Sequence, residues 1–289
     1  MSRRPTYGVV VLSQGQRPAD LDRGLTSLLA QTGVDLDVVV VGNGWDPVGL
    51  PAGARGVALS ENVGIPAGRN AGVPYVSGEL LFFLDDDARL RDTDTLARLG
   101  RLFADEPEVG LVQPRVLDPD GRPAPRRWTP RLRVGDPARS SDVTAVWEGA
   151  VAIRRELFER IGGWAGEFFY AHEGIDLAWA VWDAEARVRY AGDLVALHPA
   201  VAPTRHADLY RRSVRNRVFL ARRRLPRPVA AVYLLVWSVL TLSRLRGRQA
   251  LADSVRGVYE GLHEDAGFRR PIAWRTVWRM TRAGRPPIV

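Results

Sequence analysis

The sequence predicts an α/β protein whose central sheet is mostly parallel and flanked by helices. Short continuous apolar runs have the length of buried strands and occupy residues 7–13, 38–41, 57–59 and 80–84. Stretches with helical periodicity alternate with such runs, as is typical of a doubly wound parallel sheet. Three adjacent acids follow the run 80–84 directly. They indicate a ligand site at the carboxyl edge of the sheet.

The first strand, residues 7–13, ends at Ser13, where a loop begins. Asp20 or Asp22 can cap the helix that follows, because apolar residues then recur at helical spacing. Those residues are Leu21, Leu25, Leu28 and Leu29. The second strand, residues 38–41, and a short third strand, residues 57–59, complete the part of the sheet that precedes the acids.

The fourth strand, residues 80–84, leads into Asp85, Asp86 and Asp87. Unpaired carboxylates are costly to bury, so these three must lie at the edge of the sheet. Carboxylates this close together repel one another unless a cation holds them. Oxygen ligands suit Mg²⁺ or Mn²⁺, ions that typically bridge to a diphosphate. The alternative interpretation is a solvated turn that happens to be acidic.

Glycines are concentrated between residues 64 and 72, around Arg69 and Asn70. Their spacing does not match the dinucleotide-binding fingerprint. Several glycines still let the backbone approach a ligand, and Arg69 can pair with a phosphate. An ordinary junction between a loop and a helix explains the pattern equally well.

Residues 114–139 are predicted to be a mobile loop, because seven arginines and six prolines cannot pack a core. Trp128 lies in the middle of this segment. It is interpreted either as a sugar-binding platform or lid, or as a residue that pins the loop. A helix over residues 94–104 and a strand over 109–112 precede the loop.

A second acidic site begins at Glu173. Glu173 and Asp176 lie three residues apart at the start of a predicted helix and can face one side of it. They are either catalytic acids or capping residues that the helix dipole favours. His198 is either a metal ligand or an ordinary histidine at the end of an edge strand. The other elements predicted here are a strand over 145–153, a helix over 155–161 and edge strands over 188–190 and 194–197.

Charge is distributed unevenly along the chain, whose net charge is +8 and whose 41 basic residues are all arginines. Residues 200–289 contain 19 arginines and five acids, and residues 1–199 contain 22 arginines and 28 acids. Such a basic tail seeks phosphate groups of lipids or nucleic acids. The absence of cysteine excludes disulfides and thiolate catalysis. The apolar run 9–12 is too short for a signal peptide, so the cytoplasm is the expected location.

The tail, residues 206–289, is predicted to be helical. Its apolar stretch 229–242 is shorter than the roughly 20 residues that span a bilayer, and arginines bracket it. We interpret it as a helix lying in an anionic membrane surface, with Tyr233 and Trp237 at headgroup depth. The alternative is a helix buried against the main domain. A later stripe is predicted to face the core and comprises Leu251, Val255, Val258 and Leu262.

Four motifs occur together in the chain: Leu84-Asp85-Asp86-Asp87-Ala88; Glu61-Asn62-Val63-Gly64 with Arg69-Asn70; Gly162-Gly163-Trp164 with Phe168-Phe169-Tyr170; and Arg215-Asn216. In this combination the chain, over about residues 6–220, resembles the family 2 glycosyltransferases with the GT-A fold. It is most similar to the rhamnosyltransferase-like members that build bacterial cell-surface glycans. The first motif resembles the Asp-x-Asp motif of this family, and the third resembles the segment that leads to its catalytic acid.

The resemblance implies a GT-A catalytic domain over residues 1–205, with a nucleotide-sugar half over 1–113 and an acceptor half over 114–205. A basic helical extension over 206–289 follows. The implied ligands of Mn²⁺ or Mg²⁺ are Asp87, Asp85 and His198. The implied nucleotide-sugar contacts are Ser13, Asn43, Asn62, Arg69, Asn70, Asp85 and Asp86. The implied catalytic residues are Glu173 and Asp176, and the implied acceptor contacts are Trp128, Trp147, Glu148 and His172.

The chain departs from the family pattern at two positions. Gly42 replaces the acid that reads the nucleobase in the usual Val-Asp-Asn-Gly-Ser, so the base contact must come from elsewhere. Gly174 replaces the second acid of the usual Glu-Asp-x-Asp, which is the base. Either Glu173, our first choice, or Asp176 takes that role, or the enzyme is impaired.

The predicted function is inverting, metal-dependent transfer of a sugar from a UDP-, dTDP- or GDP-sugar to a hydroxyl group. The acceptor is a glycan, a lipid-linked glycan or a small molecule, met at the inner face of the plasma membrane through residues 206–250. One alternative is a sugar nucleotidyltransferase, which shares the sheet and the metal acids. Another is a non-catalytic protein that binds phosphate or nucleic acid. We expect no nucleic acid, because the tail lacks the interleaved aromatic residues that stack on bases.

Overall fold

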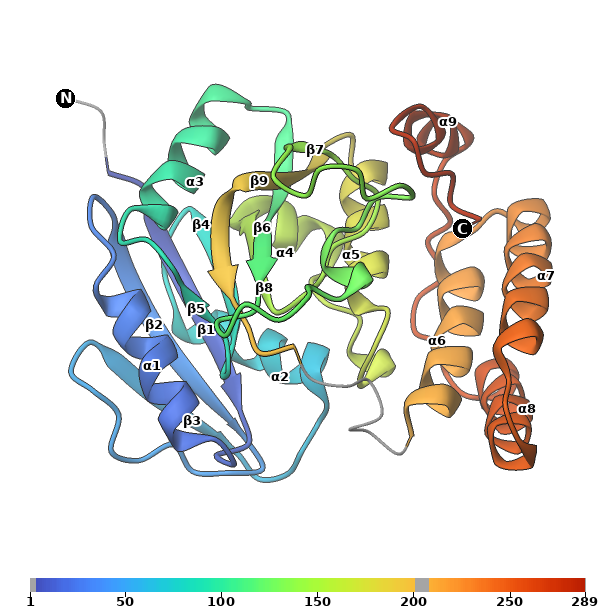
Figure 1. The fold of residues 1–289 in the computed structure, drawn as a ribbon, viewed down its shortest axis with the longest axis horizontal. Coiled ribbons are helices and arrows are strands. Elements are labelled where there is room, and N and C mark those ends of the chain that lie inside the picture. Colours follow the sequence, from blue (N-terminus) through green and yellow to red (C-terminus); the bar gives the residue numbers. More distant parts are fainter. Residues whose placement is uncertain (1–3, 201–207, 289) are drawn as a thin grey trace.

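The computed structural model describes residues 4–200 and 208–288. An α/β body forms one side of the molecule, and a column of helices from the C-terminal part forms the other (Figure 1). The predicted boundary between residues 205 and 206 lies outside the described residues.

One sheet organises the body. Its order is β3-β2-β1-β4-β8-β6-β9-β5, and β7 pairs with β9. The strands are β1 (Thr6–Ser13), β2 (Asp35–Asn43), β3 (Ala54–Leu59), β4 (Leu80–Asp85), β5 (Arg89–Leu90), β6 (Val109–Leu117), β7 (Ser141–Asp142), β8 (Ala150–Arg154) and β9 (Arg187–Leu197). Among the described residues, β1, β2, β3, β4, β6 and β9 run in one direction, while β8, β5 and β7 run in the other. The predicted α/β class with a mostly parallel sheet is therefore confirmed.

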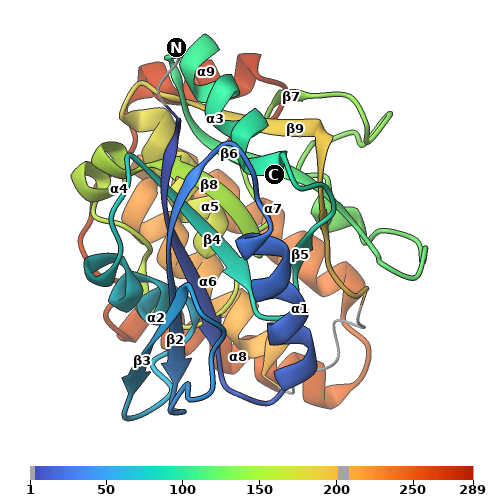
Figure 2. The ribbon, with the colours of Figure 1, turned by 90° about the vertical axis from the view of Figure 1, so that its left-hand side faces the viewer.

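Helices cover both faces of this sheet (Figure 2). One face carries α1 (Pro18–Leu29) and α3 (Thr95–Asp105), and the other carries α2 (Ile65–Gly72), α4 (Arg155–Ile161) and α5 (Glu173–Asp183). Side chains of a strand alternate between the two faces. On β4, Phe82 and Leu84 therefore join the core under α1 and α3, while Leu81 and Phe83 join the opposite core. Short 3-10 turns are η1 (Val73–Tyr75), η2 (Arg126–Trp128) and η3 (Gly166–Phe168).

The C-terminal helices pack against the body through α5. They are α6 (Leu209–Arg224), α7 (Arg227–Arg244), α8 (Arg248–His263) and α9 (Trp274–Arg282). α6 lies between α5 and the pair formed by α7 and α8 (Figure 1). In the part of the chain that the structure describes, no helix combines the length and the apolar character needed to cross a bilayer.

Two details of the tail differ from the sequence predictions. Tyr233 and Trp237 face the protein: Tyr233 is buried against Trp179, and Trp237 receives the guanidinium of Arg217 on its ring. The stripe on α8 that was predicted to be core is exposed, so that prediction is wrong; its residues are Leu251, Val255, Val258 and Leu262. α8 packs mainly on α6, which lies between it and the body, so the opposite side of α8 stays exposed.

Two details of the body also differ. Residues 145–149 are not a strand, because β8 begins only at Ala150. The two predicted edge strands are one continuous strand, β9, which lies inside the sheet between β6 and β5. Its polar residues Arg187 and Arg189 pair with acids, including Asp142 on the neighbouring strand β7.

Candidate active site

Three adjacent acids stand at the carboxyl end of β4, as the sequence predicts. The chain turns directly after the strand, since the Ala88 N–H donates to the Asp85 carbonyl at 3.0 Å. β5 then pairs with the end of β9, and this pairing brings His198 beside the turn. The imidazole Nε2 of His198 lies 3.0 Å from Oδ1 of Asp87. Ligand atoms of Asp85, Asp87 and His198 all lie within 4.8 Å of one another.

This group fits a divalent cation. Two carboxylates and one imidazole are ligands that suit Mn²⁺, and the carboxylates also suit Mg²⁺. Burial lowers the pKa of His198, which keeps the ring in the neutral form that a metal needs. His198 Nδ1 is buried and has no hydrogen-bond partner in the described part of the chain. Such an orphaned polar atom is typical of a functional site.

Asp86 belongs to the β1 side of the same edge. Ser13, the last residue of β1, donates its hydroxyl to Oδ2 of Asp86 at 2.7 Å. Arg17 forms ion pairs with both Asp86 and Asp87. Burial raises the pKa of Asp86 even though Arg17 opposes that shift. Arg17 was missed by the sequence analysis, although its place in the loop after the first strand is a usable signal.

Arg69 on α2 supports the third acid, Asp85. Its Nη2 lies 2.6 Å from Oδ1 of Asp85, and its guanidinium lies over the ring of Trp164 at 5.1 Å. The side chain is 1% exposed, but its Nε and Nη1 atoms have no partner among the described residues. Buried donors of this kind can bind an anion such as a phosphate oxygen.

Three asparagines predicted to touch the donor hold loops of this site. Asn43 donates to Oδ1 of Asn62 at 2.9 Å and accepts the Val63 N–H at 2.9 Å, which fixes the loop before α2. Asn70 is bonded at both ends of its amide to the backbone of Trp164. These contacts explain the motif as support for the loops around Arg69.

The absence of an acid at position 42 has a structural cause. A Cβ atom at Gly42 would lie 1.9 Å from the carbonyl oxygen of Trp45, because the loop after β2 folds back on the strand end. The ring of Trp45 reaches Gly15 in the loop after β1, within 2.5 Å of where a Cβ would stand. Trp45 therefore lies between the two loops that border the donor side. The sequence analysis missed this residue.

A second acidic cluster lies at the start of α5. Glu173 is 3% exposed, and its Oε2 has no partner in the described part of the chain. Glu148, in the segment before β8, accepts the Gly174 N–H on Oε1 at 2.8 Å. Burial and the neighbouring Glu148 raise the pKa of Glu173 to about 8. Burial also raises the pKa of Glu148, although the Gly174 N–H favours its charged form.

Asp176 has different surroundings. It is completely buried and forms ion pairs with Arg224 at 2.8 Å and Arg223 at 3.2 Å. Burial alone would raise the pKa of Asp176, but the two arginines outweigh it and hold the pKa below its usual value. Asp176 thus anchors α5 to α6.

Arg215 and Asn216 on α6 hold the loop that leads to Glu173. The Asn216 amide donates to the carbonyl oxygens of Phe168, Tyr170 and Ala171 at 2.7–3.0 Å. His172 follows with a left-handed backbone, φ 73°, and precedes the first turn of α5. Burial lowers the pKa of His172 to about 3, so its ring stays neutral.

The predicted acceptor residues Trp128 and Trp147 form an aromatic cluster with His198. Ring centroids lie 5.6 Å apart for Trp128 and His198 and 4.8 Å apart for Trp147 and His198. Trp128 is 1% exposed, which fits its interpretation as the residue that pins the loop. Gln113, also missed, links the two tryptophans through Trp128 O at 2.8 Å and Trp147 N at 2.7 Å.

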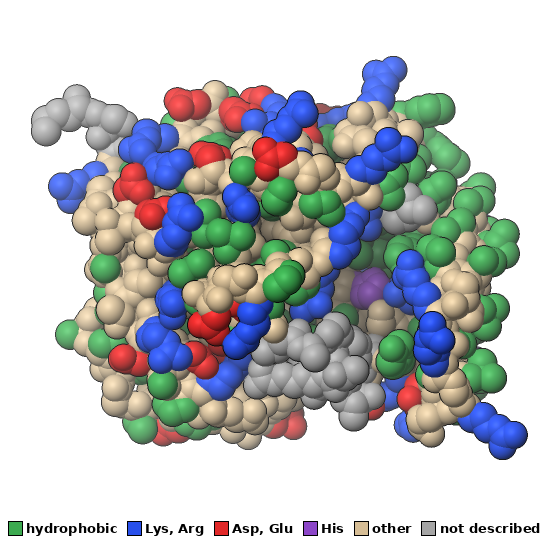
Figure 3. Space-filling model, viewed as in Figure 1, with side chains coloured by type: hydrophobic (Ala, Val, Ile, Leu, Met, Phe, Trp, Pro, Cys, Tyr) green, Lys and Arg blue, Asp and Glu red, His purple; other side chains and the backbone are tan. Residues whose placement is uncertain are grey.

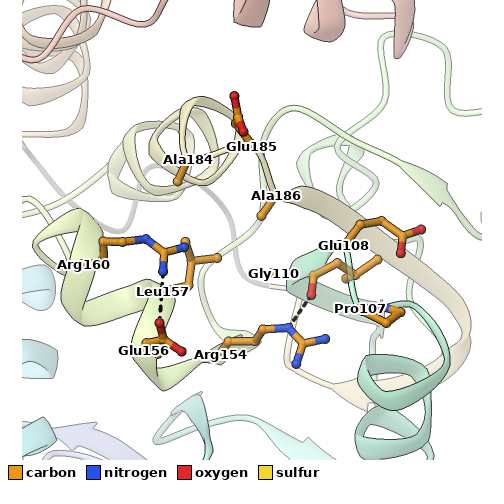
Figure 4. A pocket seen from close by; sticks show the side chains of 11 residues that line it. Pro107, Glu108, Gly110, Arg154, Glu156, Leu157, Arg160, Ala184, Glu185 and Ala186 are labelled. Carbon is orange, nitrogen blue, oxygen red and sulfur yellow. Dashed lines mark hydrogen bonds and ion pairs between the residues drawn. The ribbon is translucent and has the colours of Figure 1, made fainter.

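A separate cavity of about 220 Å³ lies at the opposite end of β6 and β9 (Figure 4). Two of its arginines have partners within the body: Arg160 reaches Glu156 at 3.3 Å, and Arg154 donates to the Val109 carbonyl at 2.9 Å. The strands separate this cavity from the acids, because β9 begins beside it and ends at Leu197, next to His198. We therefore assign the chemistry to the acidic edge.

Comparison with known proteins identifies the class. A family model for glycosyl transferase family 2 matches residues 9–162, just over half of the chain. The protein therefore belongs to glycosyl transferase family 2 and is a glycosyltransferase. No curated protein matches the chain significantly.

Solved structures of glycosyltransferases share the fold. Mannosyltransferase PcManGT from Pyrobaculum calidifontis, in complex with GDP-Man and Mn²⁺, has a TM-score of 0.56 and 18% identity over 98% of this chain and 74% of its own. GalNAc-T7 with UDP, GalNAc and Mn²⁺ has a TM-score of 0.62 and 13% identity over 92% of this chain and 57% of its own. S. aureus TarS 1-349 in complex with UDP has a TM-score of 0.55 and 16% identity over 88% of this chain and 81% of its own. At such identities the likeness concerns the GT-A fold.

Proposed function

We propose that the protein is an inverting, metal-dependent glycosyltransferase that moves a hexose or deoxyhexose from a nucleotide sugar to a hydroxyl group. The observation that carries this proposal is the group of Asp85, Asp87 and His198 at the carboxyl edge of the sheet. The acceptor we propose is a glycan, preferably lipid-linked, of the kind used by the rhamnosyltransferase-like branch. Mn²⁺ or Mg²⁺ bound there would supply a Lewis acid for the diphosphate of the donor.

The donor side of the site has a basic residue on each flank of the acids. We propose that the guanidinium of Arg69, which has unpartnered N–H groups among the described residues, binds a phosphate oxygen of a UDP-, dTDP- or GDP-sugar. We further propose that Trp45 contacts the nucleobase, since a side chain at Gly42 cannot. Ser13 orients Asp86 by its hydrogen bond, so it acts on the donor through that acid.

The acceptor side needs a base that removes the proton from the attacking hydroxyl. We assign this role to the carboxyl pair at the start of α5, Glu173 and Glu148, and a structural role to Asp176. The ion pairs of Asp176 with α6 support this assignment, because a carboxylate held by two arginines is a poor proton acceptor. In-line attack from this side would invert the anomeric carbon.

The direct test is release of nucleoside diphosphate from UDP-glucose, dTDP-rhamnose and GDP-mannose, each with Mn²⁺ or with EDTA. We expect Mn²⁺-dependent release from one donor, because water can replace an unknown acceptor slowly. Pyrophosphate formation from a nucleoside triphosphate and a sugar phosphate would instead indicate a nucleotidyltransferase. No release from any donor would contradict the proposed function.

A membrane surface is the second partner that we propose. α7 and α8 expose apolar side chains, and Figure 3 shows hydrophobic side chains gathered along the edge of the molecule away from the body. The most exposed are Leu235, Val239 and Leu242 on α7 and Val255, Tyr259 and Leu262 on α8. Arg227 and Arg244 lie at the two ends of α7 and complement anionic headgroups. This supports a peripheral location at the inner face of the plasma membrane.

A further inference from the structure

The glycine at the second position of α5 has a specific neighbour. A Cβ atom at Gly174 would lie 2.6 Å from Oε1 and 2.7 Å from Cγ of Glu148, and 2.5 Å from the carbonyl oxygen of Val146. Real Cβ contacts are essentially never this short. The space that a side chain at position 174 would enter is therefore occupied by the carboxyl group of Glu148.

Glu148 is also tied to the strand that bears the metal acids. The next residue, Gly149, accepts the Asp85 N–H on its carbonyl at 2.9 Å. A Cβ at Gly149 would lie 2.6 Å from Oδ2 of Asp85, so the backbone passes directly beside that carboxylate. Glu148 thus comes from the segment between the metal group and the start of α5.

The three carboxyl groups near the start of α5 differ in accessibility and charge. Asp176 is fully buried and neutralised by two arginines. Glu173 is 3% exposed, whereas Glu148 is partly exposed, which favours Glu148 as the group that meets an acceptor. The first N–H groups of a helix have no partner within the helix, and the N–H of Gly174 is one of them. It donates to Glu148 and so stabilises negative charge on that carboxyl group. Glu173 has no such donor for Oε2 among the described residues, so it is the group that keeps the proton.

We propose that Glu148 is the general base of the transfer reaction, with Glu173 as its protonated neighbour; this inference rests on the proposed function. A glycine is then required at position 174, because the side chain of Glu148, from the segment before β8, occupies the space that a Cβ atom would fill. This assignment replaces our first choice from the sequence, Glu173.

The proposed transfer forms one bond, breaks one bond and moves one proton. The acceptor oxygen forms a bond to the anomeric carbon while its proton passes to Oε2 of Glu148. The bond between the anomeric carbon and the diphosphate oxygen breaks, and the nucleoside diphosphate leaves with the electron pair. Glu148 then loses the proton to solvent, since its side chain is partly exposed.

The experiment compares E148Q, E173Q and the control E156Q, which alters an exposed acid on α4. The readout is Mn²⁺-dependent nucleoside diphosphate release from UDP-glucose, dTDP-rhamnose and GDP-mannose, together with calorimetric binding of the corresponding diphosphate. We expect E148Q to lose about 10²- to 10⁴-fold in kcat with nucleotide affinity unchanged. E173Q should lose at least about tenfold less than E148Q, because glutamine resembles a protonated glutamate. E156Q should equal the wild type.

A second variant separates chemistry from packing. Sodium formate should restore at least tenfold of the lost rate to E148A, since formate fits the space that the side chain leaves, and it should not accelerate E156Q. An active E148Q, or a large loss in E173Q with E148Q intact, overturns the inference while leaving the proposed function in place. A loss in E148A that formate does not restore, with E148Q active, also overturns it. A wild-type protein that releases no nucleotide overturns the proposed function and this inference together.

Discussion

At the scale of single residues, the acids at the end of β4 are not equivalent. Asp85 is paired with Arg69 from α2, Asp86 with Ser13 and Arg17 from the β1 side, and Asp87 with His198, which follows β9 directly. The sequence shows three neighbouring acids, and it predicts their place at the sheet edge. It does not show that Arg17 neutralises two of them, because that contact depends on the path of a loop.

Arg17 provides a prediction about metal affinity. Its guanidinium forms ion pairs with Asp86 and Asp87, so it competes with a divalent cation for their charge. We expect R17A to bind Mn²⁺ about tenfold more tightly in the absence of nucleotide, since a nearby positive charge is removed. Titration of free Mn²⁺ by electron paramagnetic resonance measures this. The matched control is R23A, which removes an exposed arginine paired with Asp20 on α1 and should leave the affinity unchanged. Unchanged or weaker binding in R17A would contradict the competition.

At the scale of elements, α5 connects the acidic site to the C-terminal helices. Its first turn carries Glu173 and Asp176, and α6 holds Asp176 through Arg223 and Arg224. The sequence predicts a helix here and leaves Asp176 as either a catalytic acid or a cap. Only the packing of α6, which comes from a segment far along the chain, distinguishes an ion pair from these alternatives.

The variant D176N tests this connection. It removes the ion-pair partner of the buried Arg224 and one of the two partners of Arg223, which keeps Glu167 at 3.3 Å. We therefore expect the free energy of unfolding to fall by about 3–5 kcal/mol. Urea unfolding followed by tryptophan fluorescence at pH 7 measures the loss. The control E156Q removes an exposed acid and should cost less than about 0.5 kcal/mol. A loss below about 1 kcal/mol in D176N would show that the ion pairs contribute little.

The ion pairs of Asp176 with Arg223 and Arg224 make the stability of the protein depend on pH. The pKa of Asp176 is held below its unfolded value of about 3.9 by Arg224 and Arg223. The stabilisation is therefore fully present above the unfolded pKa and is lost as the pH falls through the folded pKa. Between pH 5 and pH 2, roughly the range over which such pairs titrate, wild-type stability should fall more steeply than that of D176N. Parallel curves in urea unfolding would contradict this assignment.

At the scale of the whole molecule, much of the α/β body is predictable, since apolar runs and helical spacing are local signals. The strand β4 with its acids and the start of α5 were found in this way. The continuous strand β9 and the burial of Trp128 were not, because they depend on partners distant in sequence. The relation between Gly174 and Glu148 was missed for the same reason: it joins two segments 26 residues apart.

The exposed side of α7 and α8 gives a whole-molecule prediction. We expect the double variant L235E/V239E to reduce flotation with phosphatidylglycerol vesicles at least fivefold, because it places charges on the apolar surface. The matched control V48E/L132E alters two exposed apolar residues of the body and should float like the wild type. Equal flotation of both variants would show that this surface does not bind membranes. The wild type and both variants should float less with neutral vesicles, since arginine side chains are attracted to anionic headgroups.

We propose that Asp85, Asp87 and His198 hold a cation that completes a nucleotide-sugar site. Calorimetric titration of UDP, dTDP and GDP, each with Mn²⁺ and with EDTA, tests this claim. We predict that one nucleotide binds only with Mn²⁺, that D87A abolishes this binding, and that D105A, at an exposed position at the end of α3, preserves it. Absence of binding by all three nucleotides, or binding that persists in EDTA and in D87A, would contradict the claim.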